Sequence, residues 1–249
     1  MGKPFVPFGP DHLAAIALAF VVPVALGLVA RAGASRRVAR ALALALAAEL
    51  VATWILWYWL IWSRGWISAS TILPMQLCDW AAIAGIVALI RPTQQSYELT
   101  YFWALSGTLQ ALLTPDLYYG FPDIRFVVFF AFHDGAIAAA LYLMVACGWR
   151  PVPASLPRVI AWSLFYFVAA LAVNALFHTN FGYLSAKPLK PSLLDLMGPW
   201  PVYDFELLGL GILFLILLYA PFFVADRIRQ ARPAPVAGEK TLPFRPPPC

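Results

Sequence analysis

Charged residues are scarce in this sequence. Asp, Glu, Lys and Arg make up 12% of the 249 residues, whereas hydrophobic residues make up 62%, and the mean hydropathy is +0.78. A soluble domain carries about a quarter charged residues, so water is not the solvent of this chain. With ~20 residues for each membrane crossing plus short connections, the length fits about seven spans and leaves no separate soluble domain. The sequence therefore predicts an all-α, polytopic membrane helix bundle.

Cysteine and lysine are also rare. Cys78, Cys147 and Cys249 fall in no CxxC or Cys/His spacing, so we expect no disulfide framework, no metal site and no cofactor. The four lysines all lie outside the expected spans, which excludes a retinal Schiff base. The formal net charge of +5 is not arranged as a basic stripe alternating with aromatic residues, so no nucleic-acid partner is expected.

Seven apolar segments follow one another, separated by basic or turn-rich connections. The expected spans are His12–Ala30, Ala41–Trp62, Pro74–Ile90, Tyr97–Leu113, Ile124–Ala146, Val159–Leu176 and Val202–Ala225. Residues 1–225 would form the seven-helix membrane domain. Residues 226–249 are rich in proline and basic residues, a composition that predicts a disordered tail.

The basic residues are distributed unequally between alternate connections. If successive connections lie on opposite sides, twelve of the 17 Lys and Arg residues fall on one side and five on the other. Connections rich in Lys and Arg stay in the cytoplasm. The sequence therefore predicts an N-terminus outside and a cytoplasmic C-terminus.

A few polar groups lie inside the expected spans, where each costs roughly 2.5 to 3.5 kcal/mol on insertion and must face the bundle interior or a wet cavity. They are Glu49, Cys78, Asp79, Gln110, His133, Asp134 and Asn174. Most lie in the outer half of their spans, which predicts one polar pocket open to the outer leaflet. For Glu49, Gln110 and Asn174 we favour interhelical hydrogen bonds that fix packing over a direct catalytic role.

The outer connections hold further polar residues. Asp116, Asp123 and Arg125 flank the start of the fifth span, where loop caps and an ion pair are favoured over binding of a substrate head group. Asn180, Asp195 and Trp200 lie in the long connection before the last span.

Cys78 and His133 are the one nucleophile and base within spans on the outer side. A thiol needs a base or a positive neighbour to become a thiolate, and a histidine serves that purpose. Helix rise alone places the two residues ~7 Å apart along the membrane normal, which argues against contact. Roles in packing are the alternative for both residues.

Several strings in order support a resemblance. They are LPMQLCD (73–79), YFWALSG (101–107), LQALLTPD (109–116), FPDIRF (121–126), the His133 region, residues 180–184, Lys187-Pro188 and SLLDLMGPWP (192–201). They resemble the YwaF-like family of bacterial membrane proteins, which is similar to vertebrate transmembrane protein 164, an acyltransferase that moves acyl chains between phospholipids. The resemblance implies Cys78 as acyl acceptor and His133 as base. More distant relatives hydrolyse fatty-acid esters with a threonine nucleophile. This chain departs from the family at Gln76, where His-Leu-Cys is typical, so a nearby group that would tune the thiol is missing.

The leading hypothesis is therefore a phospholipid acyltransferase in which Cys78 carries a thioester, His133 is the base and a lysophospholipid is the acceptor. Amide groups of Gln110, Asn174 or Asn180 would stabilise the oxyanion. Asp116, Arg125, Asp195 and Trp200 are further candidates to support the substrate. Hydrolysis at the same site and a non-enzymatic lipid-binding or transport protein, with Glu49 and Asp79 as proton or cation sites, are the alternatives. Composition and resemblance predict a multi-pass protein of a bacterial cytoplasmic membrane.

Overall fold

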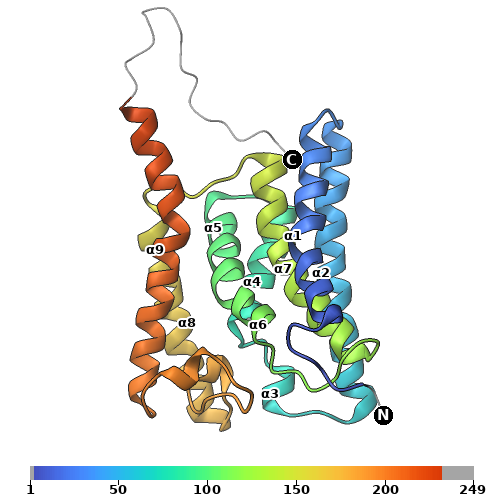
Figure 1. Ribbon diagram of the computed structural model, residues 1–249, viewed down its shortest axis with the longest axis vertical. Coiled ribbons are helices and arrows are strands. Elements are labelled where there is room, and N and C mark those ends of the chain that lie inside the picture. Colours follow the sequence, from blue (N-terminus) through green and yellow to red (C-terminus); the bar gives the residue numbers. More distant parts are fainter. Residues whose placement is uncertain (1–2, 232–249) are drawn as a thin grey trace, which may run out of the picture.

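The computed structural model describes residues 3–231, which form a bundle of helices (Figure 1). The long helices are α1 (Pro10–Arg31), α2 (Arg36–Arg64), α4 (Leu77–Ile90), α7 (Ile124–Cys147), α8 (Ser155–Phe177) and α9 (Val202–Gln230). The shorter elements are α3 (Ala69–Ile72), α5 (Gln94–Trp103), the π-helical turn η1 (Ala104–Thr108), α6 (Leu109–Leu113), and the 3-10 turns η2 (Phe181–Tyr183) and η3 (Leu193–Leu196). Between residues 3 and 231 no β-strand is formed, which confirms the all-α prediction.

Six helical stretches in the described chain are long and apolar enough to cross a membrane, with α3 and α4 counted together as Ala69–Ile90. The fourth predicted span is different. Residues 94–113 run without a break through α5, η1 and α6, but a π-helical turn interrupts the α-helical hydrogen bonding. It runs antiparallel to α4 and lies inside the bundle (Figure 1). With this stretch included, the chain passes along the bundle seven times.

Local signals set several helix ends. The side chains of Ser35 and Asp123 accept backbone N–H bonds at the starts of α2 and α7. Gly65 and Gly148 end these helices with φ of 68° and 67°, a left-handed conformation that favours glycine. At the other end of the chain, α9 continues to Gln230, so the predicted boundary of the tail at residue 226 falls inside a helix. The rest of that predicted tail, residues 232–249, lies outside the described residues.

The connections gather at two ends of the bundle. Those that follow α1, α4 and α7 lie at one end, and those that follow α2, α6 and α8 lie at the other, together with residue 3 (Figure 1). This arrangement matches the alternation on which the charge argument depends. The assignment of the first end to the cytoplasm stays a prediction. We call it the inner end and the other the outer end.

Helix α7 is the centre of the bundle. Its most apolar stretch is 67% buried, against 28% or less for the other five candidate spans. It packs against α1, α2, α4, α5, η1 and α6. Small residues permit this close approach: a Cβ atom on Gly27 of α1 would lie 2.7 Å from Val145 Cβ, and one on Gly85 of α4 would lie 3.2 Å from Ala139 Cβ.

Helices α8 and α9 form a pair at one side of the bundle (Figure 1). At the inner end Arg158 of α8 binds Glu98 of α5, and Arg150 forms an ion pair with Asp226 of α9. The Tyr101 hydroxyl donates to the Leu218 carbonyl at 3.2 Å. The most apolar stretch of α9 is only 11% buried, so this helix is attached at a few points rather than along its length.

Candidate functional site

A cavity of about 700 Å³ lies between the α8–α9 pair and the rest of the bundle. Its walls come from α2, α4, η1, α6, α7, α8 and α9 and from the outer connections. Charged and hydroxyl-bearing residues line its outer part, among them Asp116, Arg125 and Lys190, and apolar residues such as Phe214 and Leu215 line its wall along α9. This volume is in the range that accommodates a drug-sized or larger apolar ligand.

Cys78 is a free cysteine on the wall of this cavity. The helix α4 begins at Leu77, so Cys78 is the second residue of its first turn. Asp79 fixes this helix start because its Oδ2 accepts the backbone N–H of Gln76 at 2.8 Å. The unpaired N–H groups at a helix N-terminus stabilise negative charge, so those of α4 lie where they would help to stabilise a thiolate formed during a reaction.

Thr108, at the end of the π-helical turn, places its hydroxyl near the Cys78 thiol. Its Oγ1 atom is buried and forms no hydrogen bond of ordinary geometry within residues 3–231. The hydroxyl is therefore available to donate to sulfur. Nothing in the local sequence around Thr108 indicated this role, because the π-helical turn decides which residues of η1 face α4.

His133 presents one ring nitrogen to the cavity. Its Nδ1 lies 2.7 Å from the carbonyl oxygen of Phe129, and a carbonyl only accepts, so Nδ1 carries the proton in the neutral ring. The ring also stacks on Phe129 with a centroid separation of 4.2 Å. Nε2 is then the unprotonated nitrogen. In the described part of the chain it accepts no hydrogen bond from the protein, and it is not fully buried. It is thus oriented to take a proton from a group in the cavity.

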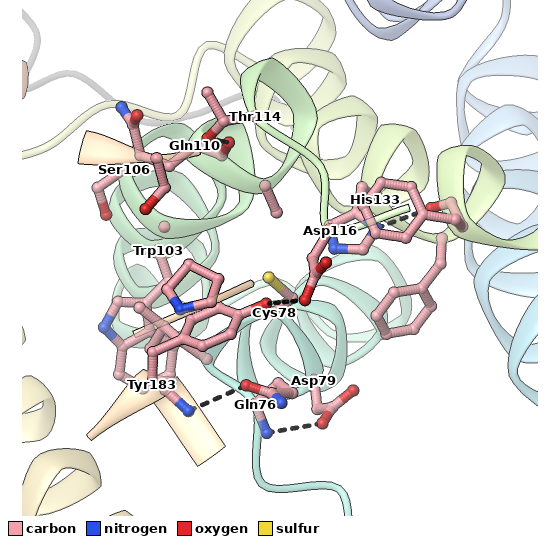
Figure 2. Close-up of a pocket in the computed structure, with 18 of the residues that line it drawn as sticks. Gln76, Cys78, Asp79, Trp103, Ser106, Gln110, Thr114, Asp116, His133 and Tyr183 are labelled. Atoms are coloured by element: carbon pink, nitrogen blue, oxygen red, sulfur yellow. Dashed lines mark hydrogen bonds between the residues drawn. The ribbon is translucent and has the colours of Figure 1, made fainter. Parts of the chain in front are cut away.

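The structure brings Cys78 and His133 to one cavity without joining them. Figure 2 shows both side chains and those of Asp116 and Tyr183 around the same space, with the Asp116 carboxylate between Cys78 and His133 in that view. Among the described residues no hydrogen bond links the thiol to the imidazole. Hydrogen bonds of a catalytic site are often long or absent without substrate and tighten only when substrate binds.

Tyr183 is a further member of the cavity wall that the sequence did not single out. Its hydroxyl donates to Asp116 Oδ2 at 3.4 Å, a long bond that joins the α6–α7 and α8–α9 connections across the cavity. Burial, together with the Asp116 carboxylate, raises the pKa of Tyr183 above its ordinary value, so the phenol stays protonated and able to donate. Tyr183 lies in a connection, where a tyrosine gives no sequence indication of function.

Gln76 gives the Tyr183 turn its position. Its Oε1 accepts the backbone N–H of Gly182 at 3.0 Å. Gly182 and Tyr183 have φ of 65° and 56°, so the turn is left-handed at both residues. At the position where the resemblance expected a histidine, this chain therefore has a residue that fixes the turn beside Cys78.

Two basic residues stand at the outer mouth of the cavity. Arg125 Nη2 pairs with Asp123 Oδ2 at 2.7 Å, which confirms the predicted ion pair, and its guanidinium lies 3.2 Å from the centroid of the Tyr119 ring. Hydrogen bonds from Arg125 lower the pKa of Asp123 to about 2. Lys190 Nζ lies 4.3 Å from the centroid of Tyr118. A cation over an aromatic face is held in place without losing its charge.

Of the other predicted site residues, Gln110, Asp116 and Arg125 line the cavity, whereas Asn174, Asn180, Asp195 and Trp200 do not. The Asn174 amide bonds to Thr179 and to both backbone groups of Phe181, and so connects the end of α8 to the next turn. The Asn180 amide is bonded to Ser185 and Ala186. Asp195 caps η3 through Ser192, and Trp200 Nε1 donates to Leu184. Because their polar groups are occupied outside the cavity, these four residues hold the outer connection together.

Glu49 and Asp134 also lie outside the cavity wall. Thr53 donates to Glu49 Oε1 at 3.0 Å, while Glu49 Oε2 and Asp134 Oδ1 are buried with no hydrogen bond in the described part of the chain. The two carboxyl groups are close enough to interact with each other, between α2 and α7.

Comparison with known proteins agrees with the resemblance. The model described as the TMEM164 family matches residues 7–219. No curated protein and no solved structure matches the sequence.

Proposed function

The chain belongs to the TMEM164 family, and we propose that it is a membrane phospholipid acyltransferase that works through a thioester on Cys78, with His133 as the base. The observation that supports this most is that the thiol at the start of α4 and the free Nε2 of His133 line one cavity. That cavity is polar at its outer mouth and apolar along α9, as an ester with a long acyl chain requires.

In the first step, His133 Nε2 takes the proton of the Cys78 thiol and the thiolate attacks the ester carbonyl carbon of a donor phospholipid. The carbon–sulfur bond forms, and the bond from that carbon to the glycerol oxygen breaks. The leaving oxygen takes the proton back from His133, which releases a lysophospholipid and leaves an acyl thioester on Cys78.

In the second step, a different lysophospholipid gives its hydroxyl proton to His133 and attacks the thioester. The carbon–sulfur bond breaks, and the thiolate regains the proton. The oxyanion formed in each step needs donors. The Gln110 amide makes no side-chain hydrogen bond elsewhere in residues 3–231, and the Tyr183 hydroxyl has only its long bond to Asp116, so both are available.

Hydrolysis differs from transfer only in the acceptor, since water in place of the lysophospholipid would release a fatty acid. A transport function receives less support. Of the two carboxyl groups named as ion sites, Asp79 lines the cavity but accepts the backbone N–H of Gln76 at the start of α4, and Glu49 does not line the cavity.

The test is acyl transfer from a labelled phosphatidylcholine to a lysophospholipid by the purified protein. We expect labelled diacyl product with the wild type and none with Cys78→Ala or His133→Ala, and an acyl mass increment on Cys78 when no acceptor is present. His178→Asn is the control, because this exposed residue does not line the cavity and has φ of 53°, which asparagine tolerates. Free fatty acid in place of diacyl product would make the protein a hydrolase. Full transfer by Cys78→Ala would refute the thioester.

A further inference from the structure

Helix α9 forms one wall of the cavity. On either side of this wall, a hydrogen bond attaches α9 to the rest of the protein. At the outer end the Tyr203 hydroxyl donates to the carbonyl of Tyr183 at 2.5 Å. At the inner end the Tyr101 hydroxyl donates to the Leu218 carbonyl, and the Tyr101 ring contacts that of Phe222 with centroids 5.8 Å apart. Between these points α9 borders the cavity from Leu207 to Leu215, a length of ~12 Å at the helical rise.

One face of this segment is turned to the cavity and the other away from it. Leu207, Gly211 and Leu215 follow one another at intervals of four and line the cavity. The residues of the opposite face, Phe205, Gly209 and Leu213, are exposed and do not line it. The two glycines therefore lie on opposite faces, two positions apart.

Neither glycine is required by the backbone or by packing. Neither has a left-handed φ, and a Cβ atom at either position would have no neighbouring atom within 4 Å. A side chain at Gly211 would thus project into the cavity, while one at Gly209 would project away from the protein. The missing side chain at Gly211 leaves open the middle of the apolar wall.

We propose that Gly211 determines the length of acyl chain that the cavity accepts, with the chain extending from the ester at Cys78 along α9 toward Leu215. This inference rests on the proposed function. The charge distribution sets the direction: Arg125 and Lys190 are at the outer mouth, where a head-group phosphate meets them, and Trp103, Phe214 and Leu215 give the chain an apolar surface. Large residues at 211 block the path of the chain.

The first measurement compares acyl transfer from a series of phosphatidylcholines of increasing chain length. For Gly211→Phe we expect a loss of roughly tenfold or more on the long chains, with short chains retained, since even one excluded methylene group costs that much. Gly209→Phe is the matched control and should keep the wild-type profile, because it makes the same substitution on the lipid-facing side of the same helix. An unchanged profile in Gly211→Phe, or the same shift in both variants, would overturn the proposal. Gly211→Leu replaces Gly211→Phe if the larger side chain prevents folding.

The second measurement does not depend on activity. A phosphatidylcholine with a diazirine at the end of its acyl chain is photolysed on Cys78→Ala protein, and the labelled peptides are mapped by mass spectrometry. We expect labelling of the segment 207–215, lost on adding Gly211→Phe and kept on adding Gly209→Phe. If the wild type transfers no acyl chain yet this pattern appears, the proposed function fails and the chain path stands. If transfer is confirmed but the label maps to other helices, the chain path is wrong.

Discussion

The ion pair between α5 and α8 should respond very differently to the loss of its two partners. Glu98 is buried, with its side chain 1% exposed, whereas the Arg158 side chain is 43% exposed. Arg158 donates two hydrogen bonds to Glu98, at 3.0 and 2.7 Å, and Gln94 and Ser155 donate two more, at 2.7 and 2.5 Å. If Arg158 is removed, water cannot reach the buried Glu98 carboxylate to replace its hydrogen bonds.

Replacing Arg158 by methionine leaves the aliphatic part in place but leaves a buried carboxylate with only two neutral donors. Breaking a buried pair in this way costs about 3 kcal/mol. Glu98→Gln keeps acceptor capacity for Gln94 or Ser155, and the remaining guanidinium is exposed enough for water to solvate it. The cost should therefore be nearer 1 kcal/mol.

The assay is thermal unfolding of the purified variants in one detergent. At roughly 2 to 4 °C for each kcal/mol in a chain of this size, we expect an apparent Tm lower by roughly 6 to 12 °C for Arg158→Met and by roughly 2 to 4 °C for Glu98→Gln. The double variant should lie close to Glu98→Gln alone, because methionine beside a neutral amide leaves no charge unpaired. A larger loss for Glu98→Gln than for Arg158→Met would refute the reasoning from burial.

Two further predictions concern the outer connections. Because the folded-state pKa of Asp123 is lowered to about 2, its pair with Arg125 contributes stability above the unfolded pKa of about 3.9, and this is lost as the pH falls toward 2. Asp123→Asn, which keeps the helix cap, should lower the free energy of unfolding by up to about 1 kcal/mol at pH 7 and by nothing near pH 2; a difference independent of pH would contradict the ion-pair explanation. Asn174→Ala should destabilise the protein by about 3 kcal/mol, because the N–H and C=O of Phe181 lose their partners, while folded protein keeps its activity. Gln110→Ala, which removes no side-chain hydrogen bond found in the described chain, is the stability control for it, and equal stability of these two variants would count against the structural role of Asn174.

The sequence alone was sufficient to predict a bundle of membrane helices, because the property that decides it, the hydrophobicity of each segment, is local. A segment of ~20 apolar residues must satisfy its own backbone hydrogen bonds in lipid, and it does so as a helix whatever its neighbours are. The fourth span shows the limit of this reasoning. Residues 94–113 contain Gln94, Glu98 and Thr108, and the packing of this stretch inside the bundle, with a π-helical turn, could not be obtained from apolar periodicity.

Some residues of the candidate site could be predicted from the sequence and others could not. Polar groups within spans identified Cys78, Gln110 and His133, because a polar side chain in lipid must face the interior. The same rule also selected Asn174, whose amide is used to hold a turn, and Glu49, which lies behind the cavity wall. In the outer connections no such rule applies, which explains why Tyr183 and Lys190 were missed and why Asn180, Asp195 and Trp200 were included.

By itself the sequence determined the solvent, the helical class, most of the helices and the pairing of Asp123 with Arg125, because each depends on composition or on residues close together along the chain. The tertiary structure decided which side chains share a cavity. Cys78, His133 and Tyr183 are brought together by the packing of α4, α7 and the α8–α9 connection. The opposite roles of Gly209 and Gly211 follow from the side of α9 on which each one lies. The rotation and packing of the helices decide which residues, distant in sequence, face the same cavity. The pattern of hydrophobic residues along the chain does not reveal this without the fold.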